Sequence, residues 1–267
     1  MRLLSAACFL AFSVHVLAAS AACVAETAPT TQPAAEVRVD PAADELLTRI
    51  ETKAGDLRTF KADLRYDRNQ VLVGDKQRRF GKIVYVVGPP AKFAVQFDRL
   101  LVDGRVEQQN QWFIYDAKWL VERNDAEKTF IKRQVVAPDA PKDQADPLNL
   151  GEGPFALPIT TKKAQILKKF DVVIEPKLQE TDPKNTVHLK LTPRTGVKSD
   201  LTRIDLWYDL ETLLPTQART LDESENETVI LVNKIVVNEP VEDQVFDVSE
   251  PKDRGWSVQV VQWEKGK

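Results

Sequence analysis

The stretch that decides the fold is FKADLRYD, residues 60–67. Its apolar residues alternate strictly with charged ones, which is the period of a β-strand with one face in a core and one in solvent. Upstream of this strand, Asp40-Pro41 has the form of a helix cap followed by the residue favoured at the first helical position. The apolar residues after it recur at helical spacing: Leu46, Leu47, Ile50, Ala54 and Leu57. The domain therefore opens with one helix and continues as sheet.

Residues 83–136 contain a series of short apolar runs, separated by turns such as Asp103-Gly104. Consecutive short connections predict a meander of antiparallel strands. Residues 138–158 interrupt the series, because their five prolines and two glycines cannot form regular sheet. Residues 160–170 then predict a short amphipathic helix, and strands resume at residue 172. We expect about ten to twelve strands with two or three helices on one face, an α+β fold built on a curved antiparallel sheet.

The first 25 residues have the features of a secretory signal: Arg2, an uncharged apolar run, and small residues up to Ala25. We expect residues 1–25 to be removed as a signal peptide, with a single membrane-spanning helix as the alternative. Residues 26–39 are rich in Pro and Ala and predict a flexible spacer. Ser20-Ala21-Ala22-Cys23 also resembles the lipoprotein signal motif, in which Cys23 is acylated and tethers the mature chain to a membrane.

The composition excludes several classes of protein. Lys and Arg number 37 against 40 Asp and Glu, so the formal net charge of −3 lacks the basic surplus of a nucleic-acid-binding protein. The chain is 43% hydrophobic and 29% charged, an ordinary globular balance. Both of its cysteines lie within the first 23 residues, which excludes a disulfide framework in the mature domain.

Nothing in the sequence indicates an enzyme. After residue 25 the chain has no Cys and one His, so we expect no metal site and no cofactor. His188 alternates with Val187 and Leu189 and should point to solvent, without a nucleophile or an orienting carboxylate in the local sequence. We expect no catalytic residues, although a pair of carboxylates for glycoside chemistry stays open, since any two acids could meet in the fold.

Several strands are apolar on both faces, as in residues 83–87, 112–115 and 229–236. An antiparallel sheet with one face in water should alternate strictly. Either other elements cover both faces, or one face lines an apolar cavity closed by the Pro/Gly-rich segment and its helix. In such a cavity each buried methylene contributes roughly 0.8 kcal/mol, so one long acyl chain could be held without a charged contact.

The order of several short segments carries a family resemblance. They are LRTFKADL (57–64), GKIVY (81–85), PAKFAV (90–95), DAKWL (116–120), PFAL (154–157), LTP (191–193), residues 233–238 and FDV (246–248). In this order, over residues 40–261, they resemble the LolA family of periplasmic outer-membrane lipoprotein carriers. Each segment alone is weakly specific, and the resemblance lies in the order in which all of them follow one another along the chain.

The resemblance implies an incomplete β-barrel over residues 40–263, with a helical lid over an apolar cavity that receives acyl groups. Carried over by position, Phe93, Val95, Phe155 and Leu157 would line the cavity or the lid. It also implies a non-enzymatic periplasmic carrier. Its partners would be acyl chains of lipoproteins or lipids, an inner-membrane donor protein and an outer-membrane acceptor protein, with no nucleic acid among them.

Two points of the resemblance leave alternatives open. Pro89 stands where the family has an Arg that latches the lid, so that form of control does not carry over. Related members of the superfamily bind lipids while anchored to a membrane or act in envelope-stress sensing. The alternative function is therefore an envelope-stress sensor or a tethered protein-interaction module on the same fold, which acylation of Cys23 would favour.

Overall fold

The computed structural model describes residues 40–137, 155–160, 162–176, 180 and 182–263. The expected signal peptide (1–25) with Cys23, and the expected spacer (26–39), lie outside the described residues. Most of the Pro/Gly-rich stretch lies outside them as well. Neither α-helix in the described ranges is long and apolar enough to cross a bilayer.

Two α-helices and twelve strands make up the described part of the chain. The helices are α1 (Pro41–Ala54) and α2 (Lys163–Lys169). The strands are β1 (Thr59–Gln70), β2 (Asp75–Val86), β3 (Lys92–Val102), β4 (Arg105–Tyr115), β5 (Trp119–Asn124), β6 (Thr129–Gln134), β7 (Phe170–Ile174), β8 (Thr186–Pro193), β9 (Leu201–Asp209), β10 (Pro215–Asp222), β11 (Glu227–Val237) and β12 (Ser257–Val261). Two 3₁₀ turns, η1 (Val71–Val73) and η2 (Asp243–Phe246), follow β1 and β11.

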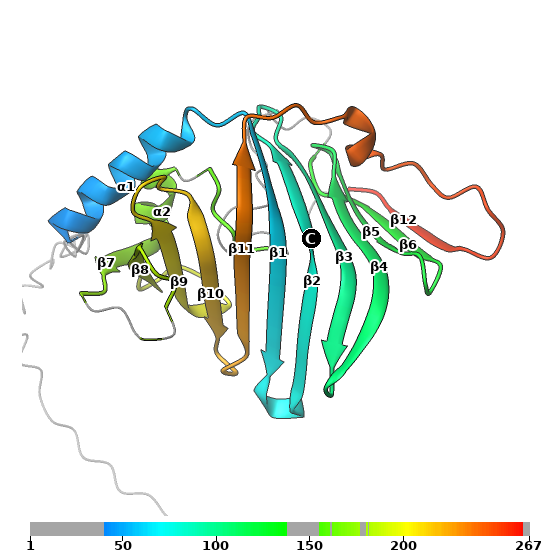
Figure 1. Cartoon of the computed structure of the whole chain (residues 1–267), viewed down its shortest axis with the longest axis horizontal. Coiled ribbons are helices and arrows are strands. Elements are labelled where there is room, and N and C mark those ends of the chain that lie inside the picture. Colours follow the sequence, from blue (N-terminus) through cyan, green and yellow to red (C-terminus); the bar gives the residue numbers. More distant parts are fainter. Residues whose placement is uncertain (1–39, 138–154, 161, 177–179, 181, 264–267) are drawn as a thin grey trace, which may run out of the picture. The chain divides into compact units, whose positions relative to one another are not determined.

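All of these strands lie in one sheet, in the order β12-β6-β5-β4-β3-β2-β1-β11-β10-β9-β8-β7 (Figure 1). Strands β1–β6 form one antiparallel meander and β7–β11 a second, and the two meet where β1 pairs with β11. The sheet is not closed into a barrel, since β12 and β7 are its two edges. The prediction of an α+β fold on a mostly antiparallel meander is confirmed.

The last strand differs from the expected antiparallel pattern. β12 pairs with β6 in parallel, with Val258 opposite Phe130. Residues 241–256 precede β12, and their Phe246 is buried in an apolar cluster with Ile114 and Phe130. Because this segment crosses the face of the sheet before β12 begins, the chain returns to the edge in the same direction as β6.

Helix α1 forms as its sequence predicts. The Asp40 carboxylate accepts a hydrogen bond from the Ala42 amide over 3.0 Å and caps the first turn. The side of α1 that the periodicity predicts is buried, and the helix packs against α2 and β7. Lys163 at the start of α2 fastens the two helices together, because its Nζ donates to Thr48 Oγ1 over 2.9 Å and lies 2.7 Å from an Asp44 carboxylate oxygen.

The two faces of the sheet are covered by different parts of the chain. We call the face that carries Leu64, Ile83 and Val95 the inner face, and the face that carries Val84 and Ala94 the outer face. The larger apolar cluster lies on the inner face together with α1, α2 and residues 155–159. A smaller cluster lies on the outer face of β3–β6 beneath residues 241–256. In this region, therefore, strands that are apolar on both sides have both faces covered.

Candidate functional site: the inner face of the sheet

Side chains from both meanders meet on the inner face. Cross-strand partners point to the same side of an antiparallel sheet, which places Leu64 beside Val232, and Ile83 beside Val95. The buried side chains of this face come mainly from five strands: Phe60, Leu64, Ile83, Tyr85, Phe93, Val95, Phe97, Leu206, Tyr208, Ile230 and Val232. The middle of the face is thus apolar along its whole width.

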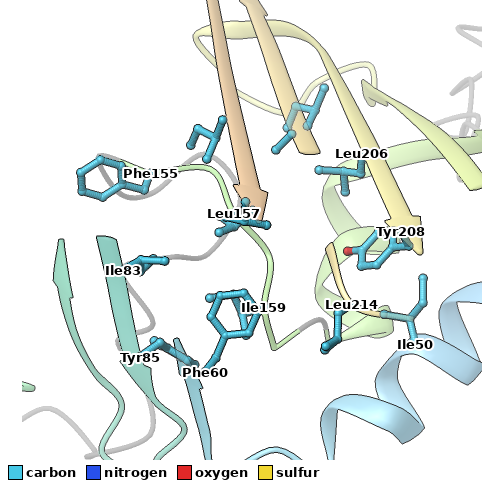
Figure 2. Close-up of a cluster of buried hydrophobic side chains, with 14 of the residues drawn as sticks. Ile50, Phe60, Ile83, Tyr85, Phe155, Leu157, Ile159, Leu206, Tyr208 and Leu214 are labelled. Atoms are coloured by element: carbon cyan, nitrogen blue, oxygen red, sulfur yellow. The ribbon is translucent and has the colours of Figure 1, made fainter. Parts of the chain in front are cut away.

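Residues 155–160 lie across this surface without joining the sheet. Figure 2 shows Leu157 and Ile159 between side chains of β1 and β2 on one side and of β9 on the other, with Phe155 on the side of β2. Their exposed fractions are 3%, 0% and 2%. The Leu157 and Ile159 amides donate to the carbonyl groups of Phe155 and Leu157, two residues earlier, and not to a strand. We call residues 155–160 the inner segment.

Phe155 fills the centre of an aromatic cluster. Its ring lies edge-on to Tyr66, Phe93 and Phe113, with centroid distances of 5.9, 6.0 and 5.3 Å. Phe97 is tilted against it at 6.2 Å. Edge-to-face pairs of this kind contribute about 0.5–1.5 kcal/mol each beyond their burial. Phe155 is therefore one anchor of the inner segment.

The structure brings together the four residues that the resemblance singled out. Phe93 and Val95 lie on β3 and Phe155 and Leu157 on the inner segment, and all four belong to one buried cluster. Their role in lipid binding stays a prediction. Ile159 belongs to the same group, and the sequence analysis missed it.

The signal that could have found Ile159 is the spacing of the inner segment. Phe155, Leu157 and Ile159 repeat every second residue, which gives an extended chain one apolar side. The helix expected at residues 160–170 follows at once as α2, with Ile166 buried beside the inner segment. Tyr85 Oη and Thr160 Oγ1 lie 3.0 Å apart in a hydrogen bond at the end of the inner segment.

No protein-family model matches the sequence, and no curated protein matches it. The chain is similar to a LolA superfamily protein. That structure, from Nitrosomonas europaea, aligns at 11% identity with a TM-score of 0.32 and covers 75% of this chain and 97% of its own.

Two further solved structures are also similar to this chain. An uncharacterized conserved protein from Thermus thermophilus aligns at 15% identity with a TM-score of 0.47, over 83% of this chain and 99% of its own. The Pseudomonas aeruginosa MucA/MucB complex aligns at 16% identity with a TM-score of 0.41, over 76% of this chain and 60% of the matched chain. Among these similar structures, the one from Nitrosomonas europaea is of a protein in the superfamily that the sequence resembles.

A buried polar cluster on the outer face corrects one expectation from the sequence. His188 does not point to solvent, since only 5% of it is exposed. Its Nε2 lies 2.8 Å from Asp205 Oδ1, and its ring stacks on Trp207 with centroids 4.2 Å apart. The alternation of β8 predicted the side of the strand correctly but not that this side is covered by residues of β9 and β10.

Asp205 is surrounded by positive groups. Arg203 Nη2 lies 2.7 Å from its Oδ1, and Arg219 Nη2 lies 2.9 Å from its Oδ2. Burial alone would raise the pKa of Asp205, but hydrogen bonds from His188, Arg203 and Arg219 hold that pKa well below its usual range. Both carboxylate oxygens are engaged by these partners. The described residues contain no group of three or more His, Cys, Asp or Glu placed to hold a metal ion.

Two pockets lie away from the inner segment. One, of about 550 Å³, is formed at the hairpin ends of β1–β3 and β11, and its lining includes Asp67, Arg78 and Glu227. The other, of about 260 Å³, lies on the outer face between Phe130 and Val245. Neither pocket includes any of the four residues that the resemblance placed at a cavity or a lid.

Proposed function

We propose that this protein is an exported, non-enzymatic carrier that binds acyl chains of lipids or lipoproteins on the inner face of its sheet. The observation that carries the proposal is the way in which this face is covered. Phe155, Leu157 and Ile159 occupy it as the carbons of an acyl chain would, and they belong to a segment that pairs with no strand. In this proposal the inner segment and α2 form the lid, and the cavity opens when the inner segment leaves.

Such an exchange replaces one set of apolar contacts on the inner face with another. Withdrawal of the inner segment uncovers apolar side chains, and an acyl chain covers them again with a contribution of roughly 0.8 kcal/mol per buried methylene. The twelve-stranded ladder stays intact, since the inner segment is outside it. The inner segment and the ligand compete for one surface. The apparent affinity for the ligand is therefore the intrinsic affinity multiplied by the fraction of molecules in which the surface is free.

A fluorescence titration with 11-(dansylamino)undecanoate tests the proposal. The unaltered chain should bind this acyl probe saturably, with a blue shift of its emission. Phe155→Ala should bind it several-fold more tightly, because the variant removes the anchor of the competing segment. Phe130→Ala is the matched control, since this equally buried phenylalanine belongs to the outer cluster. Absence of saturable binding, or an equal gain in the control, would contradict the proposal.

A second candidate is the tethered sensor or interaction module on the same fold. It is favoured by the edge strand β12, whose Val258, Val260 and Val261 are exposed beside an unpaired strand edge. Such an edge can accept a strand from a partner protein. Mass spectrometry of the mature N-terminus, with and without globomycin, separates the two candidates: an acylated Cys23 favours the tethered module, and a free periplasmic form favours the carrier.

A further inference from the structure

The inner face changes character toward the β1–β2 hairpin. Tyr66 of β1 is paired with Arg79 of β2, and Arg68 is paired with Gln77, so these four side chains share the inner face. Tyr66 contacts the rings of both Phe97 and Phe155 at 5.9 Å. The apolar surface that the inner segment covers therefore passes directly into a surface with two arginines.

Arg79 has no ion-pair partner among the described residues. Its Nη2 donates to Gln77 Oε1 over 2.8 Å, while its Nε is buried without a hydrogen-bond partner in the described part of the chain. Gln77 Nε2 donates in turn to Asp75 Oδ2 over 2.8 Å, which places an amide between Arg79 and that carboxylate. Leu100, on the other side of Arg79 in the sheet, is apolar.

Arg78, the neighbour of Arg79 in the sequence, does have a carboxylate partner. Arg78 lies on the outer face and makes a two-pronged contact with Asp67, in which Nε and Nη2 donate over 2.8 and 2.9 Å. That pairing raises the pKa of Arg78. The Arg79 guanidinium has the same fork of donors but no carboxylate in it. One of two adjacent arginines is thus neutralised by a carboxylate, while the other, on the inner face, has no carboxylate partner in the described part of the chain.

The charge on Arg79 is partly removed from water. Burial lowers the pKa of Arg79, and the like charge of Arg68 acts in the same direction, while Tyr66 and Asp75 act against it. A partly buried cation without a counter-ion is unfavourable, and an oxyanion in its fork relieves that cost through charge-assisted hydrogen bonds. The site is therefore complementary to a negative group that arrives with an apolar chain.

We propose that Arg79, with Arg68 beside it, binds the oxyanion head group of a single-chain acyl amphiphile whose hydrocarbon lies on the inner face. The head group accepts hydrogen bonds from the guanidinium fork, and the first carbons of the chain lie beside Tyr66 and Phe97. This inference rests on the proposed carrier function and adds a class of head group to it. Carboxylate and phosphate fit the same fork, so the shared requirement is a negative oxygen at one end of the chain.

Two ligands with one acyl chain test the inference: 1-oleoyl-lysophosphatidate and 1-monooleoylglycerol, which differ by a phosphate. Affinities for the full chain are measured by competition against the dansylated probe, with inorganic phosphate as a third ligand. We expect the phosphate-bearing lipid to bind about tenfold more tightly than the neutral one, the effect of one charge-assisted contact. Arg79→Gln should bring this ratio to about one, and Arg79→Lys, which keeps the charge, should retain part of it.

Arg99→Gln is the matched control, because Arg99 lies on β3 beside Phe80 and pairs with the exposed Asp98. It should keep the full ratio. Equal binding of both lipids to the unaltered chain would overturn the head-group inference while leaving the carrier function standing. Failure of both lipids to bind would overturn the carrier function itself. Competition by inorganic phosphate at the affinity of the lysolipid would show an anion site without a lipid and would also overturn the inference.

Discussion

The imidazole Nε2 of His188 lies 2.8 Å from Oδ1 of Asp205, and both side chains are buried on the outer face of the sheet. This contact joins β8 to β9, and the bond from Arg219 to the same carboxylate joins β9 to β10. Asp205 of β9 therefore binds one side chain from each of β8, β9 and β10. Its role is to hold the second meander together from the side opposite the inner face.

Asp205→Ala should destabilise the protein by about 3 kcal/mol, because it leaves the buried His188 and the partly buried Arg203 and Arg219 without the carboxylate that they share. Urea unfolding followed by circular dichroism measures this change. Asp98→Ala is the control, since Asp98 and Arg99 are each 51% exposed and such surface pairs contribute less than about 1 kcal/mol. An equal decrease in the free energy of unfolding in the two variants would show that the contacts of Asp205 contribute no more than those of an exposed ion pair.

The acid limb of the stability curve should depend on Asp205. Its native pKa is lower than the ordinary value of 3.8, so its contribution is fully present above that pH and is lost as the pH falls toward the native pKa. In that range the free energy of unfolding should fall by about 1.4 kcal/mol per pH unit for this one group. Asp205→Asn should show a correspondingly flatter curve in urea titrations at successive pH values. Parallel curves for the two proteins would contradict the assignment.

Gly81→Ala should destabilise the β2–β3 pairing by about 1–3 kcal/mol through overpacking. A Cβ at this position would lie 1.8 Å from the backbone oxygen of Gln96, at the register shift between Phe80 and Gly81. Gly104→Ala is the comparison, since Gly104 has φ of +74° and open space around it. There the expected loss is only about 1 kcal/mol, from the positive φ. Thermal unfolding measures the stability of both variants. A larger loss of stability for Gly104→Ala than for Gly81→Ala would refute the prediction.

Leu157→Asn should release the inner segment without opening the sheet. The amide side chain is unfavourable on the apolar inner face, and the inner segment makes no strand pairing that would retain it. Hydrogen exchange followed by mass spectrometry should show faster exchange at residues 155–160, while β1 and β2 keep their protection. Leu206→Asn is the control within β9, where the same change should reduce protection across the second meander. Loss of protection throughout the sheet in Leu157→Asn would contradict a detachable inner segment.

The parts of the fold that follow local rules were predictable from the sequence. Asp40 caps α1, and the alternation of residues 60–66 describes the inner and outer sides of β1. The parallel pairing of β12 was not predictable, because it depends on the path of residues 241–256 over the outer face and on no periodicity in β12 itself. Strand type is a local property, whereas the choice of partner at an edge is not.

The candidate site was predictable in part for the same reason. Phe93, Val95, Phe155 and Leu157 were named by position in a resemblance, and the structure places them in one cluster. In the string QRRF, Arg79 without a carboxylate partner could not be told apart from the paired Arg78. Only the register with β1 shows which of the two shares a face with Tyr66. The burial of His188 likewise depends on β9 and β10, which lie far along the chain.

The position of β1 between β2 and β11 has a consequence for how the chain folds. Phe60 pairs with Tyr85 nearby in sequence and with Val237 near the other end of the domain. During folding the first meander can assemble early, but one edge of its first strand stays without a partner until β11 joins it. Closing so long a loop is slow, and an open strand edge recruits other chains in the meantime. An unfolded molecule therefore gains from being held by a chaperone until β11 has paired with β1.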